Sequence, residues 1–218
     1  MGATIIIAAI SVIIAAVSFV WGVISWKKEF IGKREIELAE KVLALFYQAG
    51  DVINFIRNPL AHSEEGKTRK QLVHETEEET KYLNLAYVAF ERYHKNEDLF
   101  AELYSIKYSY MAVFGPEHIK PFNEINYVVR DILSASQVLS SYYQNLHSGV
   151  IKDVEEQEEL LDRIRENEKT IWYMGAENDE IGPRVREIIN QVEEITGKAV
   201  KRQPKLLSNL FGKFRKDN

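Results

Sequence analysis

The chain has 218 residues, no cysteine and a formal net charge of −5. Without cysteine it can form neither a disulfide framework nor a thiolate site. The charge is uneven, because residues 198–218 carry +6, which leaves −11 for residues 1–197. The negative charge of residues 1–197 disfavours general binding of nucleic acid by this part of the chain. The basic residues 198–218 are the segment suited to an anionic surface.

The N-terminal stretch TIIIAAISVIIAAVSFVWGVIS contains no charged side chain. As a helix its 22 residues would extend about 33 Å, close to the roughly 30 Å hydrocarbon core of a bilayer. It is longer than the apolar part of a cleaved signal peptide, about 7 to 15 residues, and no basic side chain precedes it. We therefore predict an uncleaved membrane-spanning helix from Thr4 to Ser25, with the lipid bilayer as a partner.

Flanking charges predict the orientation of this helix. Lys27, Lys28, Lys33 and Arg34 follow the span, and no lysine or arginine precedes it. Positive residues stay on the cytoplasmic side, so we expect a single-pass protein of the cell membrane with a cytoplasmic C-terminal domain. Trp26, Lys27 and Lys28 would then lie at the membrane surface.

Small residues form a stripe within the span. The stripe follows a spacing of 3, 4, 3 and 4 residues and consists of Ala8, Ser11, Ala15, Ser18 and Gly22. Such a spacing places them on one helical face, where small side chains let two membrane helices approach closely. The stripe predicts a homodimer formed through the anchor, and the alternative is a chance distribution of residues common in anchors.

The remainder of the chain shows helical periodicity throughout. Helices are expected over about 27–57, 68–94, 96–114, 117–147 and 150–174, and from Pro183 onward. Asn58-Pro59 and Gly115-Pro116 end two of them, Asn96 is a suitable N-cap, and residues 122–146 repeat as a coiled-coil heptad. The predicted fold class is all-α, with an N-terminal transmembrane helix followed by an antiparallel helical bundle of about five to six helices.

Apolar positions within these helices predict their buried faces. Leu72, Leu83, Ala86, Phe90 and Tyr93 would form the buried face of the second helix of the bundle. The fifth is highly charged, and its narrow apolar side would consist of Val154, Leu161, Ile164 and Trp172.

These patterns predict three domains: a transmembrane anchor over 1–26, a cytoplasmic helical bundle over 27–202 and a basic amphipathic tail over 203–218. Basic amphipathic helices lie on anionic leaflets, so Lys205, Phe211, Phe214 and Arg215 are expected to contact the membrane surface. The alternative is a last bundle helix with a solvated basic end.

Known catalytic patterns are largely missing from the sequence. Glu91 to His94 form one E-x-x-H element, whereas a carboxylate-bridged di-metal bundle needs two. Gly66-Lys67 lacks the upstream glycine of a phosphate-binding loop. We therefore predict neither a cofactor nor a metal site.

The segment Arg57-Asn58-Pro59-Leu60-Ala61-His62 resembles the RN-x3-H signature of HEPN domains. The resemblance implies an all-α, metal-independent ribonuclease with its active site at a dimer interface. Arg57, Asn58 and His62 would be the catalytic residues, with Arg57 steadying a phosphate and His62 assisting proton transfer. In the alternative interpretation, Asn58-Pro59 ends a helix, Arg57 complements its dipole and His62 is a loop residue.

A second resemblance rests on IRNPLAHSEEGKTRK and KYSYMAVFG. These segments look like parts of uncharacterised bacterial proteins that have one N-terminal membrane helix and an all-helical body. The resemblance implies the same architecture and no particular activity. The leading hypothesis is a membrane-anchored interaction, scaffold or sensing protein at the cytoplasmic face with a protein partner. The alternative is a membrane-tethered HEPN-like ribonuclease.

Overall fold

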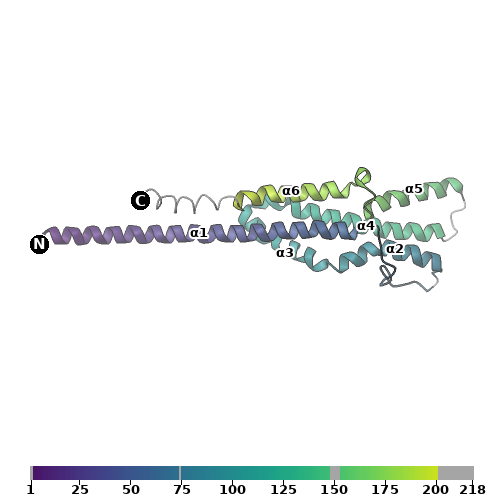
Figure 1. The fold of residues 1–218 in the computed structure, drawn as a ribbon, viewed down its shortest axis with the longest axis horizontal. Coiled ribbons are helices and arrows are strands. Elements are labelled where there is room, and N and C mark those ends of the chain that lie inside the picture. The colour runs from purple at the N-terminus through teal and green to yellow at the C-terminus, as the bar shows by residue number, and fades with distance from the viewer. Residues whose placement is uncertain (1, 74, 148–152, 201–218) are drawn as a thin grey trace, which may run out of the picture. The chain divides into compact units, whose positions relative to one another are not determined.

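The computed structural model describes residues 2–73, 75–147 and 153–200, and within these ranges it has six α-helices and no strand. The helices are α1 (Gly2–Ile56), α2 (Glu77–His94), α3 (Glu97–Phe114), α4 (Lys120–His147), α5 (Val154–Ile171) and α6 (Ile181–Val200), with two short 3-10 helices, η1 (Pro116–Ile119) and η2 (Ala176–Asn178) (Figure 1). This confirms the predicted all-α class. The described residues fall into two compact units, one of residues 2–41 and 196–200 and the other of residues 42–195.

Helix α1 joins the predicted span and the first predicted bundle helix without a break. Its large apolar side chains from Ile6 to Ile31 are all exposed where they are described. An 18-residue window of the helix has a mean hydropathy of 2.6, so α1 is long and apolar enough to cross a membrane. From Ala39 onward the helix contributes buried side chains, including Phe46 and Ile53.

An aromatic cluster joins three helices of residues 42–195. The ring of Phe122 in α4 lies 5.0 Å from that of Phe46 in α1 and 5.2 Å from that of Tyr110 in α3. All three residues are at most 1% exposed. Burial of such aromatic side chains contributes strongly to stability, so this cluster fixes α1 and α3 against the start of α4.

Helix α4 also packs against α2 and α5 (Figure 1). Its Ser136 hydroxyl donates to the Ala86 carbonyl of α2. Its Tyr143 hydroxyl donates to the Glu168 carboxylate of α5 at 2.8 Å. Because polar groups inside a core are costly when unpaired, these bonds favour one register of α4 against both neighbours.

Helix α2 begins nine residues later than the sequence predicts. Thr76 is its N-cap, since the Thr76 hydroxyl accepts from the Glu79 N–H and the Glu79 carboxylate accepts from the Thr76 N–H. This capping box is a stronger start signal than Thr68. Leu72 therefore lies outside the helix and is 61% exposed, so its predicted burial is wrong, whereas Leu83 and Ala86 are buried as predicted.

The buried face of α5 differs from the predicted one by part of a turn. Leu160, Ile164 and Ile171 are buried, whereas Val154 is 69% exposed. Val154 is the first residue of the helix, directly after its N-cap Asp153. Pro116 likewise places a 3-10 turn, η1, before α4, so α4 begins at Lys120 rather than near residue 117.

Candidate functional site

Two arginines near the C-terminal end of α1 are among the most deeply buried residues of the protein. Arg57 and Arg92 are each 1% exposed. A buried guanidinium is costly unless its five N–H donors and its charge are all compensated. The contacts of these two side chains therefore determine how the surrounding loops are built.

Arg57 follows α1 directly and reaches the C-terminal end of α5. Its Nε donates to the Thr170 carbonyl at 3.1 Å, and its Nη2 donates to the carbonyls of Lys169 and Trp172. Its Nη1 lies 2.7 Å from Oδ1 of Asp179. The last carbonyls of a helix lack partners within the helix and carry its negative dipole, so Arg57 serves as a side-chain cap for α5.

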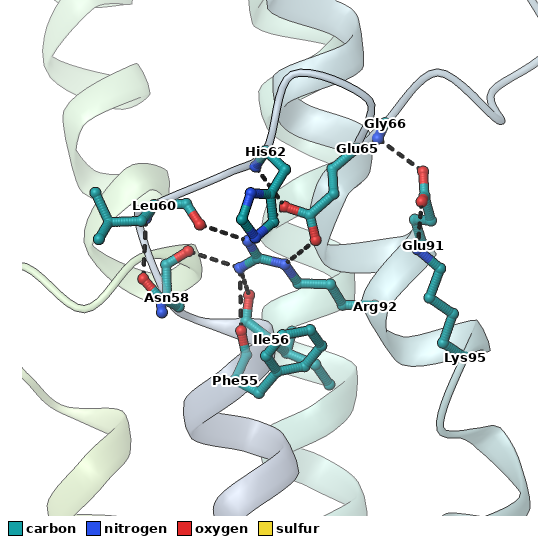
Figure 2. A network of polar contacts seen from close by, with 10 residues as sticks. All are labelled: Phe55, Ile56, Asn58, Leu60, His62, Glu65, Gly66, Glu91, Arg92 and Lys95. Atoms are coloured by element: carbon teal, nitrogen blue, oxygen red, sulfur yellow. Dashed lines mark hydrogen bonds and ion pairs between the residues drawn. The ribbon is translucent and has the colours of Figure 1, made fainter.

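Arg92 of α2 serves as the corresponding cap for α1. Its Nη1 donates to the carbonyls of Phe55, Ile56 and Asn58, and its Nη2 donates to the Leu60 carbonyl (Figure 2). Nε and Nη2 also form a two-point ion pair with Glu65, at 2.9 and 2.8 Å. Two-point pairs of this kind are strong and directional, so Arg92 fixes both the helix end and the loop after it.

The polar loop (residues 57–76) is held to α2 by Glu91, and an ion pair between Arg69 and Glu75 closes the loop on itself. Glu91 accepts hydrogen bonds from the Gly66 N–H at 2.7 Å and from Lys95 at 2.7 Å (Figure 2). Gly66 has φ +80°, and a Cβ there would lie 2.0 Å from the Asn84 carbonyl oxygen. Only glycine fits this close approach. Arg69 forms a two-point pair with Glu75, both contacts at 2.6 Å.

These contacts lower the pKa values of Glu65 and Glu75 in the polar loop and of Asp179. Hydrogen bonds from Arg92 hold the pKa of Glu65 at about 2, and those from Arg69 hold the pKa of Glu75 at about 2. Burial raises the pKa of Asp179, but the Gly182 N–H and Arg57 outweigh it, so the net direction is down. All three carboxylates are therefore ionised at neutral pH.

The three residues of the RN-x3-H segment contact different groups. Arg57 has the buried acceptors described above, and Asn58 accepts from the Leu60 N–H through Oδ1 at 2.9 Å. His62 is exposed, and its backbone N–H donates to Glu65 at 2.9 Å. Within the described residues no hydrogen bond or ion pair joins Arg57 to His62. The ribonuclease hypothesis stays a prediction, but these contacts give the side chains of Arg57 and Asn58 structural roles, whereas His62 contributes its backbone N–H.

A groove of about 790 Å³ lies between α1 and α6, next to the Arg57–Asp179 pair. Asp51, Asn54 and Arg186 line it, and none of the three has a side-chain hydrogen bond or ion pair within the described part of the chain. The remaining lining mixes apolar, aromatic and polar residues and comprises Tyr47, Gly50, Asn58, Pro59, Tyr173, Asp179, Gly182, Val185 and Ile189.

The predicted anchor residues lie on α1, outside this site. The small-residue stripe is exposed, and the Ser11 hydroxyl donates to the Ile7 carbonyl of its own helix at 2.9 Å. Trp26, Lys27 and Lys28 are exposed, and the Trp26 ring stacks on Phe30 with centroids 5.8 Å apart. The predicted tail contacts Lys205, Phe211, Phe214 and Arg215, with the domain 203–218, lie outside the described residues.

Sequence reasoning missed Arg92 altogether and assigned Arg57 a different role. Their positions carried a signal, since Arg57 lies four residues after the buried Ile53 and Arg92 lies three after the buried Ala89. An arginine at such a position lies on the same helical face as the buried apolar residues. If it is buried there, acceptors from other parts of the chain must pair with its guanidinium. No model of a known protein family matches the chain, and no curated protein or solved structure matches it either.

Proposed function

We propose that the protein is a single-pass membrane protein whose helical domain binds partner proteins at the cytoplasmic face, as a scaffold or sensor. One observation carries this proposal. Helix α1 exposes every described large apolar side chain from Ile6 to Ile31, and the same helix supplies core residues from Ala39 onward. We infer that the exposed apolar segment is the membrane anchor and that the helical domain follows it in the chain.

The exposed apolar surface of α1 supports the anchoring. Soluble monomers rarely expose contiguous apolar patches larger than a few hundred Å². Lipid would cover these side chains, and Trp26 would lie at the interface. Because Lys27 and Lys28 follow the span, we infer a cytoplasmic location for the rest of the chain. The short connections between helices favour an antiparallel arrangement of the bundle.

The contacts of the two buried arginines favour binding over phosphate chemistry. Arg57 has an acceptor on each of its three nitrogens, and Arg92 does too. A catalytic guanidinium must offer free donors to the reacting phosphate. Meanwhile the groove beside Arg57 leaves Asp51, Asn54 and Arg186 available for a partner.

A topology reporter tests the proposal. A reporter enzyme active only outside the cytoplasm, fused after Asn218, should be inactive, and one active only inside the cytoplasm should be active at the same position. Replacing Lys27 and Lys28 with glutamine should raise the outside signal, because the basic flank sets the orientation. Strong outside activity of the unaltered chain would contradict the cytoplasmic assignment.

We also propose that the anchor self-associates. Lipid provides no hydrophobic drive between helices, so close packing along Ala15 and Gly22 must supply the attraction. Residues 4–26 should give a signal in a bacterial transmembrane-association reporter. The double variant Ala15→Leu, Gly22→Leu should lose most of it, because leucine fills the groove while still favouring insertion. Equal signals at equal expression would show that the stripe has no role in association.

A further inference from the structure

Helix α3 carries a lysine on its buried face. The buried residues of this helix are spaced three and four positions apart, and they are Phe100, Leu103, Lys107 and Tyr110. Lys107 is 7% exposed, close to the 5% of Phe100. Lysines are almost never so buried without a partner of opposite charge. The surroundings of this side chain therefore need a separate explanation.

No carboxylate or other hydrogen-bond acceptor contacts the Lys107 ammonium within the described residues. Instead, Nζ lies 4.1 Å from the ring centroid of Tyr104 and 4.9 Å from that of Tyr108. Aromatic faces stabilise a cation electrostatically but accept no conventional hydrogen bond. The three N–H donors of the ammonium thus remain free for a ligand.

The two tyrosine hydroxyls lie next to each other on the same part of α3. The Tyr108 hydroxyl donates to the Tyr104 oxygen at 3.4 Å, and the two rings meet edge to face with centroids 6.0 Å apart. Two phenols that share one hydrogen bond use only one of their O–H protons for it, so the other O–H proton of the pair can reach another acceptor. Tyr104 and Tyr108 are 53% and 57% exposed, so a solute can reach the hydroxyls.

Nearby acidic groups do not neutralise this cation. The acidic residues of α3 are Glu97, Asp98 and Glu102, and within the described residues none of them forms an ion pair with Lys107. The site therefore offers only neutral and cationic donors, although residues 1–197 carry a net negative charge.

We propose that Lys107, Tyr104 and Tyr108 form a binding site for a phosphate group. A phosphate monoester carries about −1.5 to −2 charge at pH 7 and presents three acceptor oxygens, which suits an ammonium flanked by hydroxyls. Hydrogen bonds between ionised groups are roughly twice as strong as neutral ones. The phosphate would come from a lipid headgroup or from a soluble phosphorylated compound, and the site does not depend on the proposed scaffold function.

Tyrosine resonances of the full chain in neutral detergent test this site. Carbon-13 labelling of the tyrosine rings, with assignment from Tyr104→Phe and Tyr108→Phe, reports both residues directly. Inorganic phosphate would replace chloride stepwise at pH 7 and constant ionic strength. We expect saturable shifts of the Tyr104 and Tyr108 signals. Lys107→Met should weaken binding about tenfold or more, because it removes a charge-assisted contact but keeps an apolar stem of similar size.

Matched variants and lipids complete the design. Lys120→Met removes an exposed lysine elsewhere and should leave the phosphate affinity unchanged. The double variant Tyr104→Phe, Tyr108→Phe should lower the phosphate affinity of the site several-fold, and lysine side-chain signals would measure this affinity. This variant keeps the test valid if Lys107→Met fails to fold. Nanodiscs of phosphatidylcholine with and without phosphatidate would separate the two sources of phosphate.

Each result bears on the proposal. Shifts in phosphatidate nanodiscs before phosphate is added would assign the site to a lipid headgroup. Shifts with free phosphate alone would assign it to a soluble compound. The proposal is overturned if neither ligand produces saturable shifts, or if a folded Lys107→Met variant binds as tightly as the unaltered chain.

Discussion

Replacing Arg92 with methionine would remove the connection between the end of α1 and the polar loop. The variant loses hydrogen bonds to four backbone carbonyls, those of residues 55, 56, 58 and 60, and the two-point pair with Glu65. Methionine fills part of the volume but donates no hydrogen bond. The Glu65 side chain, only 10% exposed, would then be a buried charge without its partner.

The expected destabilisation is large. Removing one partner of a buried ion pair typically costs about 3 to 5 kcal/mol. Typical domains have a total stability of roughly 5 to 15 kcal/mol, so Arg92→Met should bring this domain close to unfolding at room temperature. Replacing Glu65 with methionine in the same chain should recover part of the loss, because the double variant leaves no buried charge behind.

Urea denaturation of the detergent-solubilised chain, followed by far-ultraviolet circular dichroism, measures the effect. Arg163→Met is the matched control, since Arg163 pairs with Glu159 at 2.7 Å but the two side chains are 57% and 65% exposed. Exposed pairs contribute at most about 1 kcal/mol, so the control should unfold nearly as the unaltered chain does. Equal losses from Arg92→Met and Arg163→Met would refute the capping role of Arg92.

Three further predictions concern the Tyr110 hydroxyl, the Glu65 and Glu75 carboxylates, and RNA cleavage. Tyr110→Phe should raise the free energy of unfolding by about 1 kcal/mol, measured by the same denaturation, because the Tyr110 hydroxyl is buried without a hydrogen-bond partner; a loss of stability would contradict this. In the folded protein the pKa values of Glu65 and Glu75 are about 2, below their values in the unfolded chain. Each carboxylate should therefore contribute about 3 kcal/mol to the free energy of unfolding above pH 5. This contribution should disappear as the pH falls from about 4.5 to 2. The double variant Glu65→Gln, Glu75→Gln should show a flatter acid profile, and an unchanged profile would refute the cause. Purified protein should not cleave RNA, and reproducible metal-independent cleavage that His62→Ala abolishes would favour the ribonuclease instead.

The helical class and most helix limits follow from local signals in the sequence. Asn58-Pro59 ends α1 within two residues of the expected position, and Gly115 separates α3 from η1 as expected. Asn96 stands at the N-cap position of α3, although its side chain donates to the Arg92 carbonyl instead of capping. Local rules succeed here because the groups involved are neighbours in the chain.

The second half of the polar loop could not be predicted in the same way. The break between helices at residues 58–67 was expected, but residues 68–76 have a helix-compatible composition. Only the Arg69–Glu75 pair and the capping box at Thr76 show why helix α2 starts late. The burial of Arg57 depends on carbonyls more than 110 positions away in the sequence. The spacing shows that Arg57 lies in phase with the buried Ile53, but it does not identify the distant carbonyls that accept from the guanidinium.

The two arginine positions should tolerate far fewer substitutions than the positions whose carbonyls accept their hydrogen bonds. Arg57 and Arg92 donate mostly to backbone carbonyls, which every amino acid provides. The segments that accept these bonds can therefore change their side chains without losing the contact, whereas lysine cannot replace the planar five-donor group. In a saturation mutagenesis experiment, positions 57 and 92 should each accept almost no alternative. Acceptor positions such as 60 and 169, with exposed side chains, should accept many. The sequence of the surrounding segments can therefore vary widely while the arginines at positions 57 and 92 are kept.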